Sequence, residues 1–214
     1  MIKFITTLLA LFMFSTSYAK EVKVGIILGF TGPIESLTPG MAAGAELAFN
    51  EASDSGALLG GSTVSSIRAD STCIDSAAAA SAAEFLISQG VTAIMGADCS
   101  GVTGAVLSNV AVPNGVPMIS PSATSPALTT AEDNGLFFRT APSDARGGEV
   151  LADITNDRGI TSVAITYVNT DYGVGLADVY EAAANARGIE VTAKTAHEGD
   201  KADYSAEVGV LSSA

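Results

Sequence analysis

Segments typical of β-strands and of α-helices alternate along this chain, and the alternation strongly constrains its fold. Residues 21–29 are rich in β-branched side chains, and residues 40–53 carry small and apolar side chains at helical spacing. Further strands are predicted over residues 62–69, 91–96, 116–120, 136–140, 161–168 and 189–195, and further helices over 76–88, 102–110, 143–158, 173–186 and 204–213. Such alternation forms right-handed βαβ units. We therefore expect an α/β fold with a mostly parallel sheet flanked by helices.

An irregular stretch over residues 121–135 separates two series of strands and helices. We predict an N-terminal α/β lobe over residues 20–140 and the start of a second α/β lobe over residues 141–214. The second series has only about two strands, whereas a sheet usually has about four to six. We therefore expect the second lobe to be incomplete and the sequence to be a fragment.

The first nineteen residues have the three parts of a secretory signal peptide. Lys3 is positively charged, residues 5–14 are apolar, and Ser17-Tyr18-Ala19 fits a small-x-small cleavage pattern. The alternative is a membrane anchor, but a spanning helix needs about 20 apolar residues. We predict that residues 1–19 are cleaved and that the protein is periplasmic, without membrane insertion after cleavage.

Charge and motifs exclude several classes of function. The chain has 23 Asp and Glu residues against 10 Lys and Arg residues, for a net charge of -13. Such an acidic chain repels nucleic acid and anionic lipid, so we expect neither as a partner. The sequence has no nucleophile elbow, phosphate-binding loop or zinc-protease motif, and its single histidine, His197, is expected at the surface. We predict no enzymatic activity, no metal and no cofactor.

The chain contains two cysteines, Cys73 and Cys99, each of which follows a predicted strand. In an exported protein a disulfide is the favoured state, and two buried free thiols are the alternative. Asp70, Asp75 and Asp98 cluster near these cysteines without the spacing of a calcium loop, so we expect solvated carboxylates.

Small polar residues follow two of the predicted strands, where ligands bind in open parallel sheets. Ser100 and Gly101 precede a predicted helix. Ser100 would sit at or next to its N-cap, where its hydroxyl and the free N–H groups of the first turn suit a carboxylate or a phosphate. Ser122 and Thr124 lie in a proline-bracketed loop that offers a carbonyl and a hydroxyl to an ammonium. The alternatives are an ordinary helix cap and a solvated turn. Together the two loops suit a zwitterionic amino acid, which Tyr172 could cover from the second lobe.

From residue 22 to its end, the chain resembles the leucine/isoleucine/valine-binding family of periplasmic solute-binding proteins. The order and spacing of short stretches carry the resemblance, namely residues 31–33, 44–48, 58–60, Cys73, Asp98-Cys99-Ser100, 119–126, 138–144 and 171–178.

The resemblance implies two α/β lobes that close on a ligand by hinge motion, together with a Cys73–Cys99 disulfide. It places Ser100 and Thr124 on the ligand carboxylate, and the Ser122 carbonyl and Thr124 hydroxyl on the ammonium. The ligand-binding residues implied are Ser100, Gly101, Ser122, Ala123, Thr124 and Tyr172. Leu37 stands where relatives often have a tyrosine, and the acidic partner of the ammonium is expected beyond Ala214.

The predicted function is the periplasmic substrate-binding component of an ABC importer for branched-chain or other aliphatic amino acids. Its partners would be the amino acid and a membrane permease, and we expect a monomer. The first alternative is an extracellular ligand-sensing domain of a receptor or regulator that has the same fold and binds amides or related small molecules. The second is an exported α/β enzyme, for which the sequence offers no candidate nucleophile.

Overall fold

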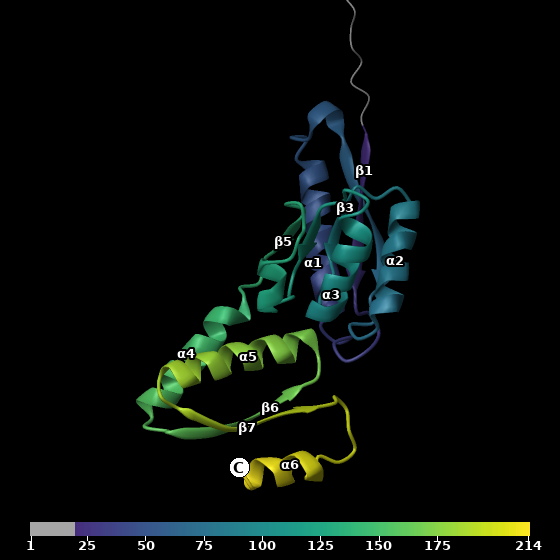
Figure 1. Cartoon of the computed structure of the whole chain (residues 1–214). Helices are drawn as coiled ribbons and strands as arrows, with labels where there is room; N and C mark the ends of the chain where they lie inside the picture. Colours follow the sequence, from purple (N-terminus) through teal and green to yellow (C-terminus); the bar gives the residue numbers. More distant parts are fainter. Residues whose placement is uncertain (1–19) are drawn as a thin grey trace, which may run out of the picture.

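The computed structural model describes residues 20–214, so the predicted signal peptide, residues 1–19, lies outside the described residues. Strands and helices alternate over the described part (Figure 1). This arrangement confirms the predicted α/β class.

The first sheet is parallel and has five strands in the order β2-β1-β3-β4-β5. They are β1 (Glu21–Leu28), β2 (Thr63–Asp70), β3 (Ala93–Gly96), β4 (Met118–Ser120) and β5 (Phe137–Arg139). The order reverses beside β1, because β2 lies on one side of it and β3 on the other. Ligands of open α/β sheets bind at such a reversal, outside the carboxyl ends of the strands.

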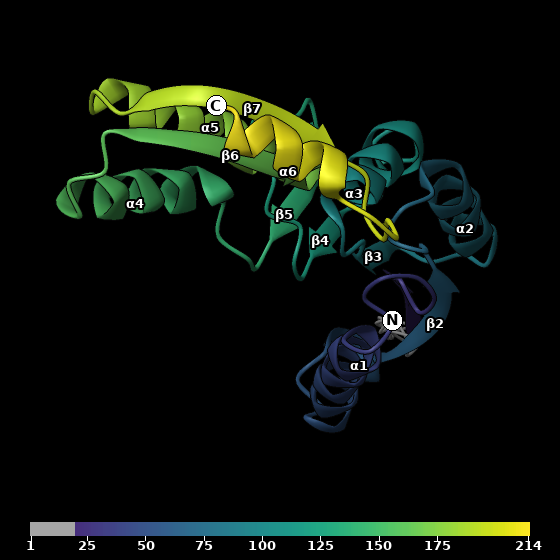
Figure 2. The same cartoon turned by 90° about the horizontal axis from the view of Figure 1, so that it is seen from below.

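Helices cover both faces of this sheet, with α1 (Thr38–Asp54) on one side and α2 (Ser76–Ser88) and α3 (Ser100–Val106) on the other (Figure 2). The alternating side chains of β1 explain the two layers. Ile26 and Leu28 pack with Ala42 of α1, whereas Ile27 belongs to the larger core formed with α2 and α3. All four side chains are fully buried.

Most predicted elements are confirmed, with shifted ends. The helix over residues 76–88 has the predicted bounds, because the side chain of Asp75 caps its first turn. The helix predicted over residues 102–110 begins two residues earlier, at Ser100, and continues past Val106 as a turn of π-helix over Leu107–Ala111. Short 3-10 turns occupy Leu59–Gly61 and Pro126–Thr129, the latter named η3.

A second parallel sheet contains β6 (Ser162–Val168) and β7 (Glu190–His197). It lies between α5 (Asp171–Ala186) on one side and α6 (Ser205–Ser212) on the other, and α4 (Asp144–Asp157) packs beside α5 (Figure 1). Ser143 caps α4, since its hydroxyl accepts from the N–H of Ala145. The division into lobes over residues 20–140 and 141–214 remains a prediction.

Candidate functional site

A buried carboxylate, that of Asp98, holds three strand ends together beside the reversal of strand order. Its oxygens accept from the N–H of Gly29 at 2.5 Å, the hydroxyl of Ser71 at 3.0 Å and the N–H of Cys99 at 2.9 Å. Asp98 is only 2% exposed. The prediction that it is solvated is therefore wrong, because three donors replace water around the carboxylate.

The two neighbouring carboxylates also stabilise local structure. Asp70 accepts from the hydroxyl and N–H of Thr31 and from the N–H of Thr72, while Asp75 caps α2. Partial burial raises the pKa of Asp70, but these hydrogen bonds outweigh it and leave the pKa below its usual value. Among residues 20–214, no group of three or more His, Cys, Asp and Glu side chains is placed to hold a metal ion.

The predicted disulfide between Cys73 and Cys99 is confirmed. The two sulfur atoms are 2.08 Å apart and the two Cα atoms 5.2 Å apart. The bond joins the loop after β2 to the residue that precedes α3. It therefore ties the start of α3, where ligand-binding residues are predicted, to the end of β2, on the other side of β1 in the sheet.

Ser100 and Gly101 are the first two residues of α3. Ser100 is only 4% exposed, and its hydroxyl oxygen accepts from the N–H of Ser125 at 3.1 Å. The hydroxyl hydrogen remains free to be donated to a ligand. Gly101 faces α5, since a Cβ atom built on it would lie 3.6 Å from a carboxylate oxygen of Asp171.

The loop after β4 lies directly against the loop after β3. The Ser122 hydroxyl donates to the carbonyl of Asp98 at 3.0 Å, and the buried Ala123 donates its N–H to the Ser120 hydroxyl at 3.0 Å. The Thr124 hydroxyl forms no hydrogen bond with any residue of the described chain. The structure thus brings together the five predicted residues of the first lobe and leaves this hydroxyl available.

Arg139, at the end of β5, stabilises the loop after β4, a role that the sequence motifs did not predict. Its guanidinium donates to the carbonyls of Ala123 at 3.3 Å and Ser125 at 2.9 Å, and to the hydroxyl of Thr129 at 2.5 Å. Charge-assisted bonds of this kind are stronger than neutral ones. Arg139 therefore fixes the backbone on both sides of Thr124.

The second lobe approaches both loops through the first turns of α5. Asp171, its first residue, faces Gly101, and a Cβ atom built on Gly175 would lie 3.1 Å from the hydroxyl of Ser125. Contacts of α5 with α3 and with η3 continue this meeting of the lobes. The loops after β3 and β4 therefore lie directly against the first turns of α5.

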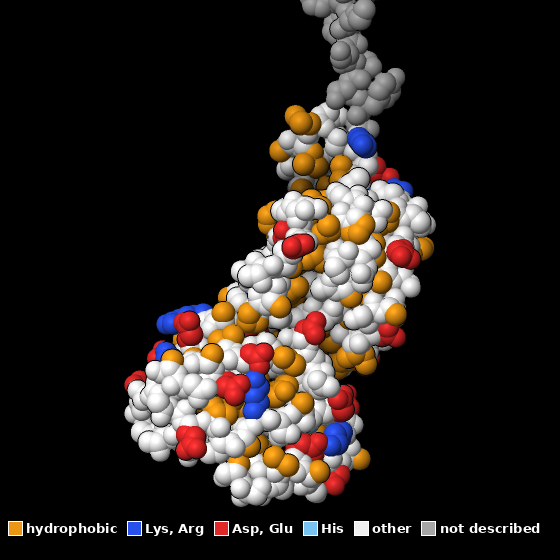
Figure 3. Space-filling model, viewed as in Figure 1, with side chains coloured by type: hydrophobic (Ala, Val, Ile, Leu, Met, Phe, Trp, Pro, Cys, Tyr) orange, Lys and Arg blue, Asp and Glu red, His pale blue; other side chains and the backbone are white. Residues whose placement is uncertain are grey.

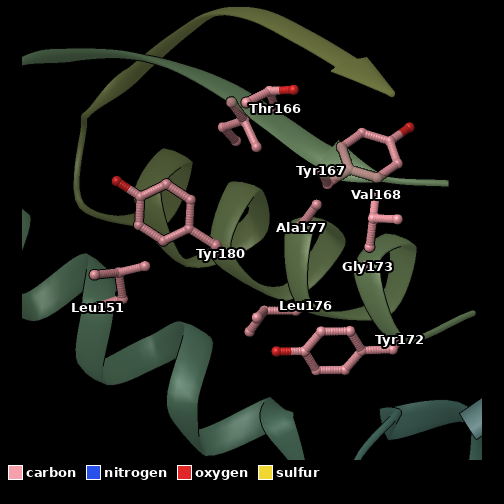
Figure 4. Close-up of a pocket in the computed structure, with 10 residues that line it drawn as sticks. Leu151, Thr166, Tyr167, Val168, Tyr172, Gly173, Leu176, Ala177 and Tyr180 are labelled. Atoms are coloured by element: carbon pink, nitrogen blue, oxygen red, sulfur yellow. The ribbon is translucent and has the colours of Figure 1, made fainter. Parts of the chain in front are cut away.

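No hydrogen bond joins Tyr172 to Ser100 or Thr124 in the part of the chain that the structure describes. It is 45% exposed and lines a cavity of about 220 Å³ between α4, α5 and β6 (Figure 4). The other lining residues are Leu151, Ile165, Thr166, Tyr167, Val168, Gly173, Leu176, Ala177 and Tyr180. The role of Tyr172 at the ligand remains a prediction.

Acidic side chains are spread over both lobes on the face shown in Figure 3, and Lys and Arg side chains are few there. His197 is half-buried, and its Nδ1 atom lies 2.9 Å from the hydroxyl of Thr166. Within residues 20–214, no helix has both the length and the apolar character needed to span a bilayer.

Comparison with known proteins supports the motif-based resemblance. The chain is 35% identical over 204 residues to Leu/Ile/Val-binding protein homolog 3 of Brucella melitensis, covering 94% of this chain and 53% of that protein. It is 34% identical over 204 residues to Leu/Ile/Val-binding protein BraC3 of Rhizobium johnstonii, covering 94% and 54%. The chain thus spans about half the length of these curated relatives.

Solved structures with the same fold bind chemically different ligands. The branched-chain amino acid binding protein LivJ of Streptococcus pneumoniae, in complex with isoleucine, is 26% identical with a TM-score of 0.75, covering 91% of this chain and 55% of that chain. A solute-binding protein of R. palustris, in complex with 4-hydroxybenzoate, is 20% identical with a TM-score of 0.77, covering 91% and 51%. The second likeness concerns the fold alone.

The family model described as "Periplasmic binding protein" matches residues 21–214, nearly all of the chain that the structure describes. This match spans both sheets and every predicted ligand-binding residue. The chain therefore belongs to the periplasmic binding protein family.

Proposed function

We propose that this chain belongs to the solute-binding component of an ABC importer and binds an α-amino acid between its two lobes. One observation carries the proposal: the loops after β3 and β4 are joined by hydrogen bonds from Ser125 to Ser100 and from Ser122 to Asp98, and they face α5. Donors and acceptors from two strand ends are thereby held side by side.

The available groups match the two ends of an amino acid. The Ser100 hydroxyl and the N–H of Gly101 would donate to the carboxylate, and the Thr124 hydroxyl would interact with both the carboxylate and the ammonium. The carbonyl of Ser122 would accept from the ammonium, with Ala123 between them in the loop. The relatives named for Leu, Ile and Val support a branched-chain or other aliphatic side chain.

The proposal includes the cellular setting. The protein would act in the periplasm, would carry its ligand to a membrane permease as a monomer, and would catalyse no reaction. Family membership supports the binding role and the location. Tyr172 would contribute from the second lobe once the lobes close on the ligand.

Calorimetry on the intact gene product tests the proposal. The panel comprises L-leucine, L-isoleucine, L-valine, polar amino acids, acetamide and benzoate, and we expect binding of aliphatic L-amino acids. A protein that binds none of the amino acids, or binds only the amide or benzoate, would overturn the proposal.

A double variant tests the site assignment. Ser100→Ala with Thr124→Ala removes two ligand-facing hydroxyls, so affinity for L-leucine should fall by at least about tenfold, because one net hydrogen bond is worth about 1 kcal/mol. Ser108→Ala is the control, since its exposed hydroxyl bonds only to the carbonyl of Gly104 on the same helix. Wild-type affinity in the double variant would contradict the assignment.

A further inference from the structure

Two glycines in the first turns of α5, Gly173 and Gly175, form a Gly-x-Gly pair that the proposed function leaves unexplained. A Cβ atom built on Gly173 would lie 2.0 Å from the carbonyl oxygen of Val168, within the second lobe. A Cβ atom built on Gly175 would instead meet the first lobe, 3.0 Å from Cδ of Pro126 and 3.1 Å from the hydroxyl oxygen of Ser125. At Gly175, therefore, the backbone of α5 lies directly against the loop after β4.

The surface that Gly175 meets is rigid and is connected to the predicted site. Ser125 is buried, its N–H donates to the Ser100 hydroxyl at 3.1 Å, and its carbonyl accepts from Arg139 at 2.9 Å. The ring of Pro126 fixes the next φ angle. Because this backbone is held from two sides, a side chain at position 175 would displace α5 and not the loop.

The same face of α5 meets both loops of the first lobe. Asp171 and Gly175 are four residues apart, so they are neighbours on the helix surface, and Asp171 faces Gly101 at the start of α3. Tyr172, which is predicted to cover the ligand, lies in the first turn of this helix (Figure 4). The distance between α5 and the two loops therefore sets how closely Tyr172 can approach a ligand held by them.

The space at Gly175 is too small for a side chain. Carbon atoms in contact are ordinarily about 3.5–4.0 Å apart, whereas a Cβ atom here would have only 3.0 Å to Pro126. Even one methyl group thus requires α5 and the loop to separate by a few tenths of an ångström. Lobes that are open on an empty site can accept such a separation, but lobes closed on a ligand cannot. Extra atoms at position 175 therefore destabilise the ligand-bound state.

We infer that Gly175 is a positioning residue for ligand binding, because its missing side chain lets α5 and Tyr172 close onto the loop that holds the ligand. This inference rests on the proposed function. Gly175 does not itself touch the ligand. It acts through the contact between α5 and the segment Ser125-Pro126, and the Gly-x-Gly pair thereby serves close packing and not phosphate binding.

A graded series at position 175 tests the inference in the intact gene product. Calorimetry with L-leucine should show at least about tenfold weaker binding for Gly175→Leu, the fold-change expected when a tight contact is overpacked, and a smaller loss for Gly175→Ala. Alanine forms helices better than glycine, so the urea midpoint of ligand-free Gly175→Ala should equal or exceed that of the wild type. Weaker binding without loss of stability distinguishes positioning from packing within one lobe.

Two further variants serve as control and rescue. Gly147→Ala makes the same change on α4, where a Cβ atom would meet nothing within 4 Å, so the affinity for leucine should stay unchanged. Pro126→Ala removes the Cδ atom that lies nearest to position 175. The double variant Gly175→Ala with Pro126→Ala, compared with Pro126→Ala alone, should therefore lose less affinity than Gly175→Ala loses in the wild-type background.

Three results would overturn the inference and leave the proposed function intact. They are wild-type or tighter binding of leucine by Gly175→Leu, a loss in Gly175→Ala that Pro126→Ala does not reduce, and a urea midpoint that falls in ligand-free Gly175→Ala. If the leucine variant does not fold, the alanine variant and its rescue carry the same test. If the wild-type protein binds no amino acid at all, the proposed function itself is wrong, and the inference falls with it.

Discussion

Replacing Asp98 by asparagine tests whether one carboxylate holds the strand ends in place. The change keeps the shape of the side chain but turns one oxygen into an NH₂ group. In one orientation that group faces the N–H of Gly29, and in the other it faces the N–H of Cys99. Neither N–H can accept a hydrogen bond, so one buried donor always loses its partner.

The cost follows from these contacts. Hydrogen bonds to a charged group contribute about 1.5–3 kcal/mol each, and an unsatisfied buried donor costs about 1–3 kcal/mol. We expect Asp98→Asn to lower the free energy of unfolding by about 3 kcal/mol. With a urea dependence of about 3 kcal/mol per molar, the unfolding midpoint should fall by roughly 1 M.

Asp75→Asn is the matched control at the same edge of the sheet. Asp75 caps α2 through a single oxygen, Oδ1, which accepts from two N–H groups, and asparagine caps helices about as well as aspartate. The urea unfolding midpoint of the Asp75→Asn variant should therefore stay close to that of the wild type. If Asp98→Asn shifts the urea midpoint no more than Asp75→Asn does, the three hydrogen bonds do not hold the strand ends, and the reasoning is wrong.

Three further predictions concern the same lobe. Gly96→Ala should cost at least about 3 kcal/mol of unfolding free energy, because φ is +126° at this residue and a Cβ atom would lie 1.9 Å from a carbonyl oxygen of β1; a urea midpoint near that of the wild type would contradict this. Replacing Cys73 and Cys99 by serine should lower the free energy of unfolding by about 3–4 kcal/mol, and reduction of the wild-type protein should lower it by the same amount, both measured by urea unfolding. Thr31→Val removes a hydrogen bond that lowers the pKa of Asp70 against the opposing effect of burial. Because the pKa is lowered in the folded state, this stabilisation is present at neutral pH and is lost as the pH falls through that lowered pKa. The difference between wild type and Thr31→Val should therefore be about 1 kcal/mol at pH 7 and should vanish in acid; a difference that persists in acid would exclude the carboxylate as its source.

Short-range sequence patterns were sufficient to predict most of the helices and strands. The Ala-rich helix over residues 76–88 and its aspartate cap are encoded within a few residues, so its bounds were predicted correctly. The helix predicted over residues 102–110 begins two residues earlier, at Ser100, and its last turn, over Leu107–Ala111, is π-helical. Local propensity thus predicts that a helix forms more reliably than where it begins.

The site was predicted only in part, for the same physical reason. Ser100 and Thr124 were identified because each follows a strand, and parallel strands end at one edge. The role of Arg139 depends on contacts with residues about 10 to 16 positions away, which no local pattern contains. The burial of Asp98 likewise results from donors on two other strand ends.

The sequence by itself determined the alternation of strands and helices, the cysteine pair and the polar strand ends. All of these follow from residue types and their short-range spacing. Only the tertiary structure decided the strand order that brings the loops after β3 and β4 together, the meeting of α5 with those loops, and which carboxylates are paired or left open. These features depend on hydrogen bonds and close packing between distant segments, which exist only once the chain has folded.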